Sequence, residues 1–187
     1  MNKGKLFVIS GASGVGKSTV LSKVMEARPD LRFSVSATTR APRPGEVDGV
    51  HYYFITKAKF EEMIAQDAFV EYDAHNDNYY GTPIQQLEER MALGPVFLDI
   101  EPAGAGIVRK KLPDATLIFI TPPSMEELER RLRSRGDTSE EQIQIRLNRV
   151  KWETEQSAWY DHVVVNDQVE ACANKILEII AQKDNEE

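Results

Sequence analysis

Short apolar runs alternate with longer amphipathic segments along most of the chain. Some runs consist mainly of aliphatic and aromatic residues, as is typical of strands buried on both faces of a sheet: 6–9, 96–100, 116–120 and 162–165. Longer segments have the spacing of amphipathic helices: 17–26, 102–111, 124–133, 139–160 and 169–182. Because buried strands alternate with helices, the pattern predicts an α/β fold with a mostly parallel central sheet flanked by helices.

Local signals sharpen three of these elements. Ser124 with Glu127, and Ser139 with Gln142, have the spacing of capping boxes, so each pair predicts the start of a helix. The single cysteine, Cys172, occupies an apolar position of the last predicted helix. We therefore predict that Cys172 is a small buried core residue.

Residues 33–92 break the alternation of buried strands and helices. Tyrosine-rich stretches within them alternate polar and apolar residues, as half-buried strands do: 50–55, 69–73 and 78–80. The loop 41–45 contains two prolines and therefore cannot be helical. We interpret residues 33–92 as an inserted, partly antiparallel lobe.

The rest of the pattern predicts one domain over residues 1–187. Its core would consist of residues 1–32 and 93–187, with residues 33–92 as the lobe. Residues 130–142 are rich in arginine and contain a glycine between two predicted helices. This composition predicts a short, arginine-rich lid.

Composition narrows the class of protein. The 187 residues are 41% hydrophobic and carry a formal net charge of -7, which is typical of an ordinary globular protein and disfavours nucleic-acid or membrane-surface binding. No apolar run approaches the roughly 20 residues that span a bilayer. The one cysteine excludes an intrachain disulfide, the histidines lack metal-ligand spacing, and the N-terminal residues do not resemble a secretory signal. We expect a cytoplasmic protein.

Residues 11–18 fit the pattern G-x-x-x-x-G-K-[ST] between a predicted strand and a predicted helix. Glycines allow the backbone to form a nest of N–H groups, and the following helix N-terminus also favours an anion. Lys17 can reach the β- and γ-phosphates of a nucleoside triphosphate, and the Ser18 hydroxyl can bind Mg²⁺. The alternative is a glycine-rich turn with an incidental lysine. The candidate ATP-binding residues of this loop are Gly11, Ala12, Ser13, Gly14, Val15, Gly16, Lys17, Ser18 and Thr19.

A second anion site is indicated in the lobe. Arg40 and Arg43 flank a proline-stiffened turn, so their guanidinium groups can converge on one phosphate dianion. Tyr52 and Tyr80 could add hydroxyl donors to the same phosphate.

Residues 38–54 resemble the guanylate kinase signature T-[ST]-R-x-x-[KR]-x-x-[DE]-x-x-G-x-x-Y-x-F and match every fixed position. The likeness extends over nearly the full chain. It implies a P-loop kinase that transfers the γ-phosphoryl group of ATP to GMP, and to dGMP, with Mg²⁺, giving ADP and GDP for purine nucleotide metabolism. The small-molecule partners would be ATP and GMP, whereas protein partners and the oligomeric state are unknown.

The resemblance also implies which residues bind GMP. Its phosphate would be held by Arg40, Arg43, Tyr52 and Tyr80, and its base by Ser36, Glu71, Thr82 and Glu101. A carboxylate such as Glu71 can accept from both N1–H and the amino group of guanine, a donor pair that adenine lacks. Alternatively, Glu71 is a solvated charge, and Thr82 caps a helix with Pro83 at its first position. Relatives commonly have Asp at 101 and Gln at 103, so these departures leave base selectivity open.

The same resemblance implies the catalytic groups. Lys17, Arg131, Arg135 and Arg146 would neutralise the transferring phosphoryl group. Asp99 would either hold Mg²⁺ through water or orient the attacking phosphate of GMP. Asn166 resembles the residue that contacts adenine, or else it is a turn residue. Alternatively, the arginines that follow one another near the end of a predicted helix form a solvated helix end that favours the helix dipole: Arg130, Arg131, Arg133 and Arg135.

Two other functions remain open. One is a catalytically inactive guanylate-kinase-like module that binds phosphopeptides or partner proteins, although Lys17, Ser18 and Asp99 are all present. The other is a P-loop kinase for another phosphorylated acceptor, such as AMP or a sugar phosphate.

Overall fold

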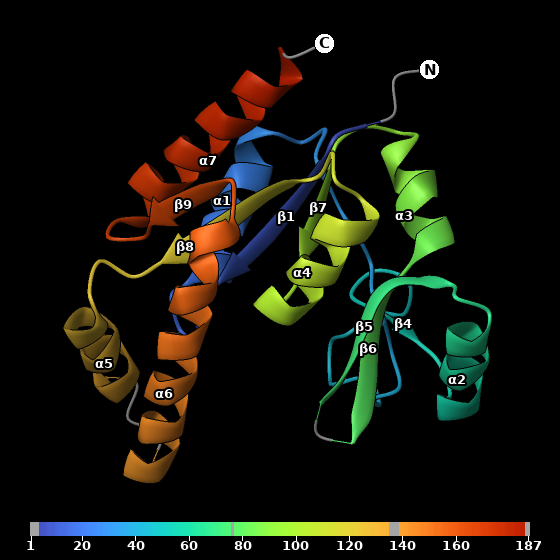
Figure 1. The fold of residues 1–187 in the computed structure, drawn as a ribbon, viewed down its shortest axis with the longest axis horizontal. Coiled ribbons are helices and arrows are strands. Elements are labelled where there is room, and N and C mark those ends of the chain that lie inside the picture. Colours follow the sequence, from blue (N-terminus) through green and yellow to red (C-terminus); the bar gives the residue numbers. More distant parts are fainter. Residues whose placement is uncertain (1–3, 76, 135–138, 186–187) are drawn as a thin grey trace. The chain divides into compact units, whose positions relative to one another are not determined.

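A five-stranded sheet and a four-stranded sheet organise this computed structural model, which describes residues 4–75, 77–134 and 139–185 (Figure 1). The chain divides into two compact units. Unit 1 comprises the described residues up to Phe7, Asp30–Asp99 and Ala103–Ala115. Unit 2 comprises Val8–Pro29, Ile100–Pro102 and the residues from Thr116 onward. The predicted division into core, lobe and lid stays a prediction.

The five-stranded sheet has the order β2-β7-β1-β8-β9. Its strands are β1 Leu6–Gly11, β2 Arg32–Phe33, β7 Val96–Asp99, β8 Thr116–Thr121 and β9 His162–Val165. The pairs β2–β7 and β8–β9 are parallel. All four apolar runs of the sequence are strands, which confirms the α/β fold with a mostly parallel sheet. The two-residue strand β2 is too short to give a hydrophobic period.

Unit 2 contains most of the long helices. They are α1 Lys17–Ala27, α5 Met125–Ser134, α6 Glu140–Gln156, the 3₁₀ helix η1 Ser157–Trp159 and α7 Val169–Asp184. The two predicted caps are confirmed, because the Ser124 and Ser139 hydroxyls accept hydrogen bonds from the Glu127 and Gln142 amides at 3.1 and 3.4 Å. Helices α1 and α7 pack side by side (Figure 1). Cys172 on α7 is buried, as predicted.

The four-stranded sheet lies in unit 1 and has the order β4-β3-β6-β5. Its strands are β3 Ala37–Thr38, β4 Tyr53–Phe54, β5 Phe69–His75 and β6 Asn78–Pro83. β3 and β4 are parallel, whereas β6 is antiparallel to both β3 and β5. The prediction of a partly antiparallel insertion is therefore confirmed.

Unit 1 also contains two helices that the sequence pattern does not predict and nearly all of a third that it does predict. The helices are α2 Lys57–Ala65, α3 Ile84–Met91 and α4 Pro102–Lys111. Helix α2 begins after Thr56, whose hydroxyl accepts a hydrogen bond from the Lys59 amide at 3.2 Å. Its Phe60 stacks on Phe69 and Tyr79, with ring centroids 4.3 and 5.1 Å apart. This small aromatic core packs α2 against β5 and β6.

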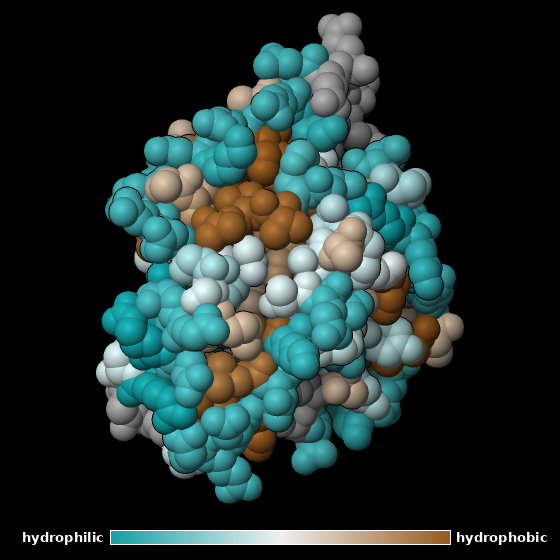
Figure 2. Space-filling model, turned by 60° about the vertical axis from the view of Figure 1, so that its left-hand side comes forward, coloured by the Kyte–Doolittle hydropathy of each residue, from teal (hydrophilic) through white to brown (hydrophobic). Residues whose placement is uncertain are grey.

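A helix must be both long and apolar to span a membrane. Within the described residues, none of the helices combines the length and the apolar character that crossing a membrane requires. Hydrophilic residues cover most of the face in Figure 2, with smaller groups of hydrophobic residues between them.

Candidate active site

The phosphate loop connects β1 to α1 in unit 2. Gly14 and Gly16 have positive φ values of 82° and 89°, which side-chain-bearing residues rarely adopt. Gly16 is the N-cap of α1, so the amides that follow it face away from the helix toward its N-terminus. A nest at a helix N-terminus is the backbone geometry that binds phosphate.

Long-range hydrogen bonds hold this loop in place. The Ala12 amide donates to the Ile120 carbonyl at 3.1 Å, and the Ser13 amide donates to Glu153 Oε2 at 2.8 Å. The Val15 amide is engaged as well, because it donates to the Ala12 carbonyl at 3.0 Å. The cradle therefore falls to the amides of Gly14, Gly16 and the first residues of α1, and any contact of Ser13 with ATP has to come from its side chain. Glu153 lies on α6 and is buried.

Asn166 also anchors the loop. Its side chain is buried, and Nδ2 donates to the Val15 carbonyl at 2.7 Å. The Asn166 carbonyl in turn accepts from Arg131 Nη1 at 3.0 Å. These contacts give Asn166 a positioning role on the loop, and its predicted contact with adenine stays a prediction.

The arginines of α5 and α6 differ in their surroundings. Arg131 is half-buried and bound to Glu127 and to two backbone carbonyls, whereas Arg130 and Arg133 are exposed and form ion pairs on the helix surface. Arg130 and Arg131 together lower the pKa of Glu127 to about 2. Arg146 lies on α6 and is half-buried. Arg135 lies outside the described residues.

Arg40 is the centre of a side-chain cluster in unit 1. Its Nη1 and Nη2 donate to the two oxygens of Glu46, both at 2.9 Å, and Nη1 also donates to the Ala41 carbonyl at 2.7 Å. The guanidinium lies 5.5 Å from the Tyr52 ring centroid, and Tyr52 lies edge-on to Tyr80 at 6.1 Å. The hydrogen bonds with Glu46 lower the pKa of that carboxyl to about 2 and, with Tyr80, raise the pKa of Arg40.

This cluster brings together three of the four predicted phosphate ligands. The fourth, Arg43, lies on the exposed turn, and its amide donates to Glu46 Oε2 at 2.7 Å. Glu46 therefore fixes both the side chain of Arg40 and the backbone of the turn. Glu46 and the Ala41 carbonyl together accept three of the five N–H donors of the Arg40 guanidinium, so the remaining donors are those that could bind another group.

Glu71 and Thr82 form a buried pair on β5 and β6. The Thr82 hydroxyl donates to Glu71 Oε1 at 2.6 Å. Thr82 is 0% exposed and Glu71 is 6% exposed. Burial raises the pKa of Glu71, with a further contribution from the charge of Asp73, although the Thr82 hydroxyl opposes the shift. The carboxylate is thus desolvated and held in one orientation.

The helix-cap interpretation of Thr82 is wrong. Pro83, not Thr82, occupies the N-cap position of α3, and no side chain caps this helix. Thr82 is still part of β6, and its hydroxyl is committed to Glu71. The solvated-charge interpretation of Glu71 is also wrong, because Glu71 is buried.

The other predicted site residues lie at the ends of strands. Ser36 precedes β3, and its carbonyl accepts from the Tyr53 amide at 2.9 Å. Asp99 is the exposed last residue of β7. Glu101 lies in unit 2, where Oε1 is 2.5 Å from Arg149 Nη2 on α6.

Comparison with known proteins identifies the family. The family model of guanylate kinase matches residues 3–183. The chain belongs to the guanylate kinase family.

Solved structures agree with this assignment. The crystal structure of guanylate kinase from Anaplasma phagocytophilum is 31% identical, with a TM-score of 0.75 over 98% of this chain and 87% of that chain. The crystal structure of TT1252 from Thermus thermophilus is 17% identical, with a TM-score of 0.57 over 97% of this chain and 98% of that chain, and shows a similar fold. The predicted family and the predicted enzyme class, a nucleoside monophosphate kinase, are confirmed.

The guanylate kinase site also contains residues that sequence reasoning missed. Glu46 could have been found, because it is the fixed acidic position of the signature. Arg149 and Glu153 have the i, i+4 spacing of a helical ion pair. Nothing in the sequence connects Glu153 to Ser13, which lies 140 residues earlier.

The candidate metal ligands fit Mg²⁺. Ser18 and Asp99 are both exposed, and both offer the hard oxygen donors that Mg²⁺ prefers. Within the described residues there is no group of three or more acidic, histidine or cysteine side chains that could enclose a metal ion. The chemistry of each donor taken by itself is compatible with Mg²⁺, which is usually bound by a few protein oxygens together with substrate phosphates and water.

Proposed function

We propose that this guanylate kinase family enzyme transfers the γ-phosphoryl group of ATP to GMP, giving ADP and GDP, and to dGMP, giving ADP and dGDP, for purine nucleotide metabolism. One observation carries the choice of acceptor: β6 contributes both to the Arg40 cluster, through Tyr80, and to the carboxylate pair, through Thr82. Residues two apart on a strand point to the same face and lie roughly 7 Å apart. A single sheet face therefore offers a phosphate-binding end and a base-binding end.

The base-binding end suits guanine. The buried Glu71 carboxylate has one oxygen bound to the Thr82 hydroxyl and can accept the adjacent N1–H and amino donors of guanine. Adenine presents an acceptor at N1 and would leave the buried charge unpaired, which is unfavourable. We assign further base contacts to Ser36 and Glu101 by the family resemblance.

The phosphate-binding end suits a dianion. Arg40 is held by Glu46, and Tyr52 and Tyr80 lie against each other beside it. Arg43 contributes charge from the neighbouring turn. Oriented guanidinium and hydroxyl donors bind phosphate with little loss of side-chain entropy, because other contacts already fix them.

For the donor nucleotide, the amides of Gly14, Gly16 and the first residues of α1, together with the Lys17 side chain, would bind the β- and γ-phosphates of ATP. Ser18, and Asp99 through water, would hold Mg²⁺, which when bound neutralises charge on the phosphate oxygens. Arg131, Arg135 and Arg146 would stabilise the transferring phosphoryl group, and with Lys17 they would keep water from it. The acceptor oxygen of GMP is largely ionised at neutral pH, so no general base is needed.

An acceptor panel tests this function. ADP formation is measured in a coupled assay with ATP, Mg²⁺ and, separately, GMP, dGMP, AMP, CMP, UMP and a sugar phosphate. We expect turnover with GMP and dGMP, loss of turnover on chelation of Mg²⁺, and strong preference over AMP. Preference for AMP or the sugar phosphate would indicate the alternative kinase, and no ADP with any acceptor would indicate the inactive binding module.

A further inference from the structure

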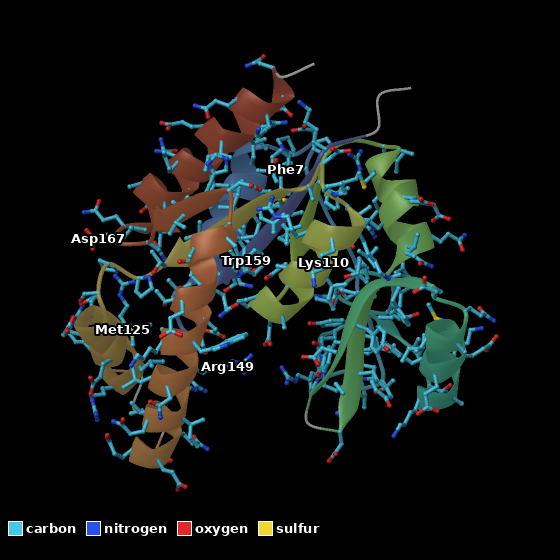
Figure 3. All side chains as sticks on the ribbon, in the orientation of Figure 1. Phe7, Lys110, Met125, Arg149, Trp159 and Asp167 are labelled. Carbon is cyan, nitrogen blue, oxygen red and sulfur yellow. The ribbon has the colours of Figure 1, made fainter. Side chains whose placement is uncertain are left out.

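Arg149 on α6 binds two carboxylates at once. Its Nη2 lies 2.5 Å from Glu101 Oε1, and its Nε donates to Glu153 Oε1 at 3.0 Å. All three residues belong to unit 2. Figure 3 labels Arg149 on α6, and the side chain extends away from the helix.

Glu153 continues this chain of contacts to the phosphate loop. Its other oxygen accepts the Ser13 amide at 2.8 Å, and its side chain is only 3% exposed. A buried carboxylate is unfavourable unless charged and hydrogen-bonded partners compensate it. Arg149 supplies the charge and Ser13 the amide, so the position of the loop depends on the Arg149–Glu153 pair.

Glu101 differs from Glu153 in its freedom to move. Its side chain is 59% exposed, and Arg149 is the ion-pair partner that holds it. The methylene groups of a glutamate also give its carboxylate a long reach. A carboxylate in this setting can exchange one donor for another at small free-energy cost.

We infer that Arg149 is a positioning residue that couples guanine recognition by Glu101 to the phosphate loop through Glu153 and Ser13. The inference rests on the proposed function, because it takes Glu101 as a base contact. When Glu101 accepts hydrogen bonds from guanine, its ion pair with Arg149 weakens. The positive charge of Arg149 is then less neutralised by Glu101. It acts on Glu153 and on the phosphate loop, which favours binding of the triphosphate. GMP and ATP would therefore bind with positive cooperativity.

The test measures ATP binding by calorimetry in the absence of GMP. Glu101→Gln should tighten ATP binding about threefold to tenfold, because it releases Arg149 as guanine would. Arg149→Met should weaken ATP binding about tenfold, because Glu153 loses its counter-charge. In the Arg149→Met background, Glu101→Gln should have no effect on ATP affinity. Glu155→Gln, an exposed glutamate on the same helix, is the matched control and should leave ATP affinity unchanged.

Several outcomes would overturn the coupling. They are unchanged ATP affinity in Glu101→Gln, an equal effect of Glu155→Gln, or additive effects of Glu101→Gln and Arg149→Met, which would indicate a general electrostatic field. If Arg149→Met fails to fold, the ATP affinity of Glu101→Gln compared with that of Glu155→Gln still tests the coupling. Both glutamates are exposed, so neither substitution should prevent folding. These results concern ATP binding alone, so failure of the coupling is distinguishable from failure of the acceptor panel.

Discussion

The phosphate loop of unit 2 and the Arg40 cluster of unit 1 are both expected to bind phosphate, but they are built in different ways. The loop uses backbone amides, two glycines with positive φ and one lysine. The cluster uses side chains, with Arg40 fixed by Glu46 and stacked near Tyr52. A backbone site is encoded by a short contiguous motif, whereas a side-chain site depends on residues that the fold must bring together.

This difference predicts which substitutions impair ligand binding at each site. In the loop, most side chains can change as long as the glycine geometry and Lys17 remain. In the cluster and the neighbouring Glu71–Thr82 pair, one substitution removes a specific donor or acceptor. Variants in the loop should therefore affect ATP, and variants in unit 1 should affect GMP.

The largest effect is expected for Lys17→Met. The methionine keeps the length of the side chain but removes the charge that stabilises the transferring phosphoryl group, so kcat should fall at least about a thousandfold. GMP binding, measured by calorimetry, should change little. Lys23→Met is the control, because Lys23 is exposed on the same helix and forms a local ion pair with Glu26 at 3.4 Å. A comparable loss in the control, or loss of GMP binding in Lys17→Met, would contradict the separation of the two sites.

Glu71→Gln should produce the next largest effect. The variant keeps an acceptor for Thr82 but loses the charge and one acceptor for guanine, so the ratio of kcat/KM for GMP to that for AMP should fall about a hundredfold. The KM for ATP should stay the same. Glu62→Gln provides the control, since Glu62 is exposed on α2 and binds Lys59 at 3.0 Å. Unchanged selectivity in Glu71→Gln would remove Glu71 from base recognition.

The pH dependence sharpens this prediction. Burial raises the pKa of Glu71 above 4.5, so its folded-state carboxyl becomes protonated at a higher pH than an exposed glutamate does. A protonated carboxyl loses acceptor capacity, and GMP affinity should therefore fall as the pH is lowered through that raised pKa. The GMP phosphate titrates as well, near pH ~6. Its contribution cancels in the ratio of wild-type to Glu71→Gln affinity, and a ratio independent of pH would contradict the assignment.

The sequence predicts the loop and the central sheet well because both depend on local patterns. Apolar runs mark β1, β7, β8 and β9, and the glycine–lysine motif marks the turn into α1. Burial of the strands and the N-terminus of the helix follow directly from those patterns. The chemistry of the loop is therefore predictable from eight consecutive residues.

Unit 1 was harder to predict, since tertiary packing decides its elements. Helix α2 has a weak apolar pattern, with only Phe60 fully buried among its residues. The chain changes from strand to helix at Pro83, and the Thr82 hydroxyl binds Glu71 instead of capping α3. The family resemblance indicated the roles of these residues, but only the fold shows that β5 and β6 bring Glu71 and Thr82 together.

Gly16→Ala tests the phosphate loop, which is the site built from backbone groups. Its effect should be smaller than that of Lys17→Met or Glu71→Gln. An alanine would require φ near 89° and place Cβ 3.1 Å from Asn166 Nδ2, which holds Val15. The free energy of unfolding should fall by about 2 kcal/mol, and ATP binding should weaken while GMP binding persists. Gly45→Ala is the matched control, because Gly45 has φ 87° and a Cβ added there would meet nothing within 4 Å. Equal losses of stability in Gly16→Ala and Gly45→Ala would mean that backbone strain alone, and not the contact with Asn166, destabilises the Gly16→Ala variant.

Glu46→Gln tests the Arg40 cluster, which is the site built from side chains, and should have the smallest effect. The amide can still bind Arg40 but lacks the charge that orients it, so the KM for GMP should rise about threefold to tenfold with kcat nearly unchanged. The folded-state pKa of Glu46, about 2, lies below the ordinary 4.5. Its stabilising contribution is therefore complete above pH 4.5 and is lost as the pH falls through 2.

Thermal unfolding of the wild type and of Glu46→Gln should accordingly differ most at neutral pH and converge on acidification. The difference should be small, because the Arg40 and Glu46 side chains remain 15% and 18% exposed and water screens the pair. A large rise in the KM for GMP with no change in thermal stability would show that Glu46 orients Arg40 for the ligand and contributes little to the fold. A rise in the KM for ATP of the same size would instead mean that the side-chain site and the backbone site do not act on separate substrates.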